Sequence, residues 1–161
     1  QIEQAPTGTR ILFSAHGLPE KVIAAGDPYQ HQCEKTAEAI VKELNISGLD
    51  WQICYQSRVG PLKWIGPSTE EALQKAALDK KGVILYPHAF VSEHVETLVE
   101  IDMEYRHKAE QLGLPYFAKA ETVGTHPDFI SGLAKLVKDA IDGKPCGRGC
   151  PSKFSRCACE V

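Results

Sequence analysis

The 161-residue sequence lacks three features that would each define a class of protein. No apolar run approaches the roughly 20 residues of a membrane-spanning helix, so a transmembrane protein is not expected. No basic segment followed by an apolar one opens the chain, so we expect no secretory signal peptide. Neither sign of charge dominates: 18 Lys and Arg stand against 21 Asp and Glu, and a net charge of −3 gives no support for nucleic-acid binding.

The remaining composition is that of an ordinary globular protein. Hydrophobic residues make up 43% of the chain and charged residues 24%, and the length suits one domain with a substantial core. The chain begins with Gln1 rather than Met, so we expect a fragment or a processed product.

Cysteine is scarce in the body of the chain and crowded at its end. Cys33 and Cys54 fall on apolar patterns that indicate core positions, and the other four lie within the last sixteen residues: Cys146, Cys150, Cys157 and Cys159. A disulfide scaffold would spread its cysteines through a small secreted chain. The crowding therefore favours metal or cluster ligation in a reducing compartment. We expect a cytoplasmic protein and leave open an attachment to the surface of the inner membrane.

Apolar patterns predict strands and helices in alternation. Strands are expected over residues 10–14, 51–55, 82–86 and 116–120, and helices after Asp27-Pro28, from Ser68, over 93–112 and from Thr125. This order predicts an α/β fold: a four-stranded parallel sheet with helices on both faces, flavodoxin-like. We expect a flexible leader over 1–9, the α/β domain over 10–142 and a cysteine-rich tail over 143–161. The last helix has an apolar face of Phe129, Ile130, Leu133, Leu136, Val137 and Ala140.

The loops that follow the strands are the expected place of a site, because ligands of such sheets bind beyond the carboxyl ends of the strands. The first strand leads to His16, and the third leads to His88 and then His94. An imidazole there can accept a proton near neutral pH or bind a metal. A loop histidine in an ordinary hydrogen bond is the alternative.

Four carboxylates share one stripe of the helix expected over 93–112. Glu93, Glu96, Glu100 and Glu104 fall within roughly an 80° arc at the helical period. A solvated face is the usual explanation of such a run. However, no basic residue interleaves the stripe, and like charges four residues apart destabilise a helix. Such a cluster can also hold protons or pass a cation along.

The loop after the second strand, residues 56–67, is rigid and basic. It contains two glycines, two prolines, Arg58, Lys63 and Trp64. Cations beside an indole suit a flat ligand that carries carboxylates, whereas a packed turn with Trp64 in the core explains the composition equally well.

The tail cysteines have the spacing C-x3-C-x6-C-x-C, without the C-x2-C pairs of common zinc sites. Thiolates at this density suit zinc or an iron–sulfur cluster. Nearby basic residues would offset the negative charge of such a centre: Lys144, Arg148, Lys153 and Arg156.

At these positions the sequence resembles the ferrochelatase family. The matching stretches run in the family's order over nearly the whole body: 12–19 (LFSAHGLP), 26–29 (GDPY), 55–61 (YQSRVGP), 64–67 (WIGP), 87–98 (PHAFVSEHVETL) and 100–105 (EIDMEY).

The resemblance implies an enzyme that inserts Fe²⁺ into protoporphyrin IX to make haem, with this chain as its C-terminal half. His16, His94, Glu96 and Glu100 would be catalytic, with His16 and Glu96 meeting the substrate Fe²⁺, and Ser57, Arg58 and Trp64 would bind porphyrin. The tail resembles that of bacterial members with a [2Fe–2S] cluster. Cys150, Cys157 and Cys159 match the ligand pattern, and either Cys146 or the missing N-terminal half supplies the fourth ligand.

Two alternatives stay open. The enzyme could take coproporphyrin, or the chain could be a non-catalytic iron–sulfur or zinc module on an α/β scaffold. A half without its partner is expected to be inactive alone and to expose an apolar wall, so self-association as a homodimer also stays open.

Overall fold

The structure is a computed structural model that describes residues 1–58, 60–144, 150–151 and 154–157. Its elements follow in the order η1 (Ile2–Gln4), β1 (Arg10–His16), α1 (Glu20–Ala24), α2 (Tyr29–Leu44), β2 (Trp51–Gln56), α3 (Thr69–Leu78), β3 (Val83–Tyr86), the π-helix η2 (Glu96–Glu104), α4 (Tyr105–Gln111), β4 (Phe117–Lys119) and α5 (Pro127–Ile141).

The four strands form one parallel sheet in the order β2-β1-β3-β4, which confirms the predicted fold class. β1 lies in the middle, and its residues pair with Trp51–Gln56 on one side and with Val83–Tyr86 on the other. It is therefore a nearly fully buried strand, as a central parallel strand must be.

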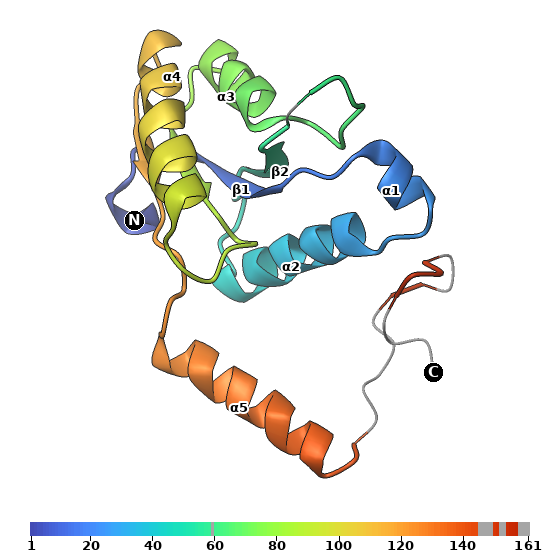
Figure 1. Ribbon diagram of the computed structural model, residues 1–161. Helices are drawn as coiled ribbons and strands as arrows, with labels where there is room; N and C mark the ends of the chain where they lie inside the picture. Colours follow the sequence, from blue (N-terminus) through green and yellow to red (C-terminus); the bar gives the residue numbers. More distant parts are fainter. Residues whose placement is uncertain (59, 145–149, 152–153, 158–161) are drawn as a thin grey trace.

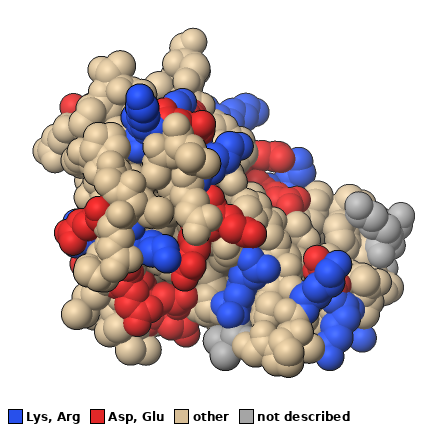
Figure 2. Space-filling model, turned by 90° about the horizontal axis from the view of Figure 1, so that it is seen from above, with Lys and Arg blue, Asp and Glu red and all other residues tan. Residues whose placement is uncertain are grey.

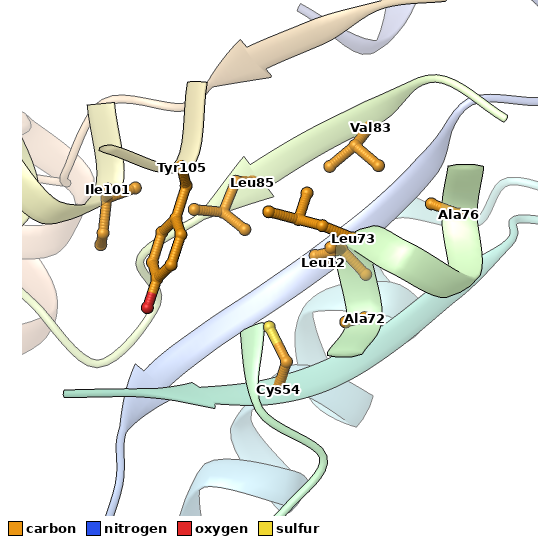
Figure 3. Close-up of a cluster of buried hydrophobic side chains, with 9 residues drawn as sticks. All are labelled: Leu12, Cys54, Ala72, Leu73, Ala76, Val83, Leu85, Ile101 and Tyr105. Carbon is orange, nitrogen blue, oxygen red and sulfur yellow. The ribbon is translucent and has the colours of Figure 1, made fainter. Parts of the chain in front are cut away.

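Helices cover both faces of the sheet (Figure 1). On one face, α3, η2 and α4 enclose a core in which Leu12, Leu73 and Leu85 are fully buried (Figure 3). On the other face, α2 packs through Ala37 against Ile11 and Phe13. Cys33 and Cys54 are buried in these layers, and burial raises the pKa of both thiols, that of Cys54 to about 12. Both are core residues, as predicted.

The helix starts follow the capping signals in the sequence. Ser68 and Glu71 form a capping box at α3, as predicted. Asp27 accepts a hydrogen bond from the Tyr29 backbone N–H, so it caps α2 although the helix begins one residue after Pro28. The short α1 is an addition to the four expected helices.

Two segments differ from the expected boundaries. Residues 1–9, expected to be a flexible leader, contain η1, and Ile2 packs against the core on the α2 face. The helix expected over 93–112 begins only at Glu96, and its first nine residues are π-helical before α4 continues it. π-helical turns are uncommon and occur often at functional sites.

The amino edge of the sheet is closed by ion pairs. Arg10 is nearly buried and bonds Asp50 and Asp79, and Lys81 also bonds Asp50. Acidic and basic side chains are both present on the face shown in Figure 2, in keeping with the near balance of charge. None of the helices in the described part of the chain is long and apolar enough to cross a membrane.

Candidate active site

His16 lies at the carboxyl end of the central strand β1, and its ring is fixed by one hydrogen bond. The distance from its Nδ1 to the Gly17 carbonyl oxygen is 2.8 Å. A carbonyl oxygen can only accept, so Nδ1 carries the proton and the lone pair of the neutral ring lies on Nε2. Nε2 is 3.9 Å from Glu96 Oε2, and about 40% of each side chain is exposed, 42% for His16 and 38% for Glu96. An acceptor nitrogen therefore faces a carboxylate at an open edge of the sheet.

Glu96 is the first residue of η2, which places its carboxylate opposite His16. Its Oε2 is shielded from solvent by the fold, and within the described residues it accepts no hydrogen bond. A buried carboxylate oxygen that accepts no hydrogen bond lowers the stability of the fold unless it binds a proton or a cation. The pair thus has the chemistry of a site for a cation or for protons.

His94 lies next to this pair, but its ring caps the helix. Its Nδ1 accepts a hydrogen bond from the Glu96 backbone N–H at 3.2 Å, and its backbone N–H donates to Thr97 Oγ1 at 2.9 Å. The ring also lies 4.9 Å from that of Phe90. In the neutral ring the proton is therefore on Nε2, and His94 orients the first turn of η2 and with it Glu96.

Glu100 is one turn further along η2, and its carboxylate is held by donors from two elements. Ser57 donates to it twice, from the backbone N–H at 2.9 Å and from the hydroxyl at 2.6 Å. The Tyr105 hydroxyl donates at 2.9 Å, and Gln56 Nε2 lies at 3.5 Å. These bonds tie η2 to the end of β2, so Glu100 is fixed while the Glu96 Oε2 opposite His16 is not.

The predicted stripe of four carboxylates is broken at its first member. Glu93 precedes the helix and accepts hydrogen bonds from Lys119 Nζ at 2.7 Å and from the Thr122 backbone N–H at 2.9 Å. The expectation that no basic residue neutralises the stripe is wrong here, because Lys119 comes from β4. Burial alone would raise the pKa of Glu93, but these hydrogen bonds outweigh it and lower the pKa to about 2.

The loop after β2 packs directly on the loop that carries His16. Ile65 N–H donates to the Leu18 carbonyl, and Glu20 N–H donates to the Lys63 carbonyl. Gly17 makes this approach possible, since a Cβ at its position would lie 2.9 Å from the Gln56 carbonyl oxygen and 3.4 Å from the Trp64 ring. The sequence did not identify this role of Gly17, which depends on two loops meeting.

The same loop borders an open pocket of about 410 Å³ beside Glu100. Arg58 and Trp64 line it together with Ser57 and Tyr105. Arg58 is 3.3 Å from Glu71, so its charge is shared with α3, and within the described residues the buried Trp64 Nε1 has no acceptor. The three residues expected to bind a substrate are thus gathered around one pocket.

Three polar residues of the site were not predicted from sequence. Gln56 and Tyr105 bond Glu100, and Lys119 bonds Glu93. Tyr105 looks like a core residue on its helix, and only the fold brings it to Glu100. His88, by contrast, is held against Phe13 with 5.7 Å between ring centroids, and burial lowers its pKa, which favours the neutral ring.

Two of the four tail cysteines are described. Cys150 and Cys157 lie in one buried cluster with Phe154, whereas Cys146 and Cys159 lie outside the described residues. Within the described ranges, no three His, Cys, Asp or Glu side chains are gathered as metal ligands.

Comparison with known proteins identifies close relatives of this chain. The sequence model of the ferrochelatase family matches residues 1–141. A ferrochelatase of Caulobacter vibrioides is 53% identical over 162 residues, 97% of this chain and 46% of that protein. A ferrochelatase of Rickettsia conorii is 48% identical over 94% of this chain and 46% of its own length, and one of Pelagibacter ubique is 47% identical over 93% and 45%. The chain thus spans about half the length of these relatives.

A solved structure shares the fold. The putative cobalamin (vitamin B12) biosynthesis protein CbiX of Marinobacter aquaeolei matches with a TM-score of 0.61 over 84% of this chain and 98% of its own. Its sequence identity of 18% supports a common fold and no more.

Proposed function

This chain belongs to the ferrochelatase family, and from that premise we propose that it is the C-terminal half of an enzyme that inserts Fe²⁺ into protoporphyrin IX. The observation that carries the proposal is the placement of His16 Nε2 3.9 Å from Glu96 Oε2 at the carboxyl edge of the sheet. The family membership indicates the reaction, and this pair supplies the groups that the reaction needs.

Insertion exchanges two pyrrole protons for one Fe²⁺, so the site must accept two protons and release a metal. In this proposal His16 takes one proton on Nε2. The Glu96 carboxylate first holds the incoming cation and takes the other proton once the metal has passed to the porphyrin. Imidazole is a ligand of intermediate hardness and carboxylate is a hard ligand. Both bind Fe²⁺ less tightly than thiolates do, so the metal can be released. His94 and Glu100 act through position, the first by orienting Glu96 and the second by fixing η2 to β2.

The porphyrin would lie over the pocket lined by Ser57, Arg58 and Trp64. An indole offers a flat apolar surface to the macrocycle, and Arg58 offers a cation to a propionate. Since Ser57 already donates both of its hydrogens to Glu100, its contribution to porphyrin binding is indirect.

The test uses the full-length enzyme that contains this sequence. Replacing His16 with Ala should lower the rate of zinc or iron insertion by about 10²-fold or more, because a positioned base contributes roughly 10²–10⁴-fold. His107→Ala is the matched control, since His107 is an exposed histidine on α4. An insertion rate in H16A as high as those of H107A and the wild type would refute the role of His16.

We further propose that the other half of the enzyme covers two apolar surfaces. No residue of α5 is buried, and Leu136 and Ile141 are 66% and 79% exposed. On the α2 face of the sheet, a groove of about 660 Å³ is lined by Ile11, Phe13, Ile84 and Tyr86. Because the chain spans only 46% of the Caulobacter relative, the remainder of such a protein is the occupant we propose. A stable dimer of the isolated chain in sedimentation would favour a second copy instead.

We also propose a [2Fe–2S] cluster on the tail, held by Cys150, Cys157 and Cys159, with Cys146 or a residue of the other half as fourth ligand. The two described cysteines fit such a centre, since they are buried together and Gln32 directs an N–H at the Cys150 sulfur. Bound there, the cluster would supply one-electron chemistry. An absence of bound iron and sulfide in anaerobically purified full-length enzyme would refute it.

A further inference from the structure

The described part of the tail lies against the corner between α1 and α2. The Arg156 backbone N–H donates to the Gly26 carbonyl at 3.1 Å, and the Phe154 ring lies 5.0 Å from that of His31. Gln32 Nε2 donates to Cys150 Sγ at 3.6 Å. In Figure 1 this red segment lies beside α1, well away from the body of α5. The tail thus returns to the α/β domain after leaving it through α5.

The corner is shaped for this contact. Gly26 has a φ of +93°, a conformation that favours glycine, and a Cβ there would lie 2.3 Å from Ser155 Oγ and 3.1 Å from Ser155 N. Any side chain at this position would displace the tail. Cys150, Phe154 and Cys157 are only 5–8% exposed as a result of the packing.

We propose that Gln32 is a positioning residue that hydrogen-bonds the sulfur of Cys150 as a ligand of the tail's metal centre. The inference rests on the cluster in the proposed function. A protonated thiol is a weak acceptor that gains little from an amide donor, whereas a metal-bound thiolate carries negative charge that a nearby N–H stabilises. Gln32 is neutral, so its donor is present at every pH.

The proposal predicts the direction of an electrochemical change. Reduction adds negative charge to the sulfurs, so a hydrogen bond to a ligand sulfur stabilises the reduced cluster more than the oxidised one. Removing the Gln32 amide should therefore make the midpoint potential more negative. A purely structural contact would leave the potential where it is.

The test compares Gln32→Leu with Gln30→Leu in the full-length enzyme. Both residues lie in the first turns of α2, but Gln30 bonds Glu34 rather than a sulfur. Each reconstituted protein is titrated with dithionite and followed by its visible spectrum. We expect a more negative midpoint potential in Q32L alone. A cluster with an unchanged potential in Q32L would overturn the proposal.

A second measurement tests the contact between the tail and the α1–α2 corner separately from the presence of the cluster. In the metal-free full-length protein, maleimide labelling of Cys150 followed by peptide mass analysis reports how well the tail is covered. Phe154→Ala removes the ring contact with His31 and should speed labelling several-fold. If labelling is faster in F154A but no variant, nor the wild type, gains a cluster on reconstitution, the cluster is refuted and the contact between the tail and the α1–α2 corner is retained. If labelling of F154A is as slow as that of the wild type, that contact is refuted.

Discussion

Ser57 holds the carboxylate of Glu100 with both of its donors, the backbone N–H at 2.9 Å and the hydroxyl at 2.6 Å. These bonds join the residue that follows β2 to the π-helix η2, which carries Glu96. Ser57 has a φ of +58°, so the chain bends sharply there to bring both donors onto one oxygen pair. The relationship explains why Glu96 keeps its place opposite His16, since η2 is anchored one turn away.

Replacing Ser57 with Ala should therefore destabilise the full-length enzyme by about 1.5–3 kcal/mol, the usual contribution of a hydrogen bond to a charged group. Urea-induced unfolding followed by circular dichroism measures the change. Ser47→Ala is the control, because Ser47 is exposed in a loop and should change stability by less than about 0.5 kcal/mol. Equal unfolding midpoints for the two variants would contradict the anchoring role.

The contact between Glu93 and Lys119 predicts a dependence on pH. The folded-state pKa of Glu93 is about 2, below the ordinary value of 4.5, so its contribution to stability is complete above pH 4.5 and is lost as the pH falls toward about 2. Glu93→Gln should lower stability at pH 7 and lose less than the wild type between pH 4.5 and 3. Unfolding midpoints at those pH values test this, with Glu121→Gln, an exposed residue, as control. Parallel pH profiles for wild type and E93Q would count against the pairing.

The sequence was sufficient for the parts of the fold that depend on local pattern. The four strands of the sheet, the capping box at Ser68 and the core positions of Cys33 and Cys54 all follow from residues close together in the chain. The sequence also indicated His16 as a candidate site residue, because the carboxyl ends of parallel strands meet at one edge. Glu96 was indicated differently, by the stripe of carboxylates on one helix and by the resemblance to the family.

What the sequence could not show depends on residues that are distant in the chain. Lys119 reaches Glu93 across 26 positions, and Ser57 reaches Glu100 across 43. The helix starts at Glu96, three residues after Glu93, whose side chain bonds Lys119 and the Thr122 backbone N–H. A periodicity of 3.6 residues likewise cannot reveal a π-helical turn, because the same side chains satisfy both spacings over a few residues.

Replacing Gly17 with Ala should destabilise the protein through a steric clash rather than through the loss of a contact. Its added Cβ in Gly17→Ala would lie 2.9 Å from the Gln56 carbonyl oxygen, so the two loops at His16 must separate, at a cost of about 1–3 kcal/mol as in other overpacked sites. We expect a lower unfolding midpoint and a higher KM for porphyrin. The nearest side-chain atom is Arg58 Cγ at 3.2 Å, so the double variant with Arg58→Ala separates the causes. Since the backbone contact is closer, stability should not recover, and full recovery would show that Arg58 alone is displaced.

Substitutions on the apolar face of α5 test the proposal that the other half of the enzyme covers this helix. Leu136 and Leu78 are both exposed in this chain, at 66% and 84%, but only Leu136 belongs to the apolar face that we propose the other half covers. In the full-length enzyme, Leu136→Asp should cost about 2 kcal/mol or more, because a buried leucine contributes roughly 1.5–3 kcal/mol and a buried carboxylate adds a penalty. Leu78→Asp should stay within about 0.5 kcal/mol of the wild type. Chemical denaturation of both variants measures the difference. If the two substitutions prove equally mild, α5 remains in solvent in the full-length protein and the proposed contact is wrong. If L136D is costly and L78D is not, the apolar face of α5 is covered in the full-length protein, as we propose.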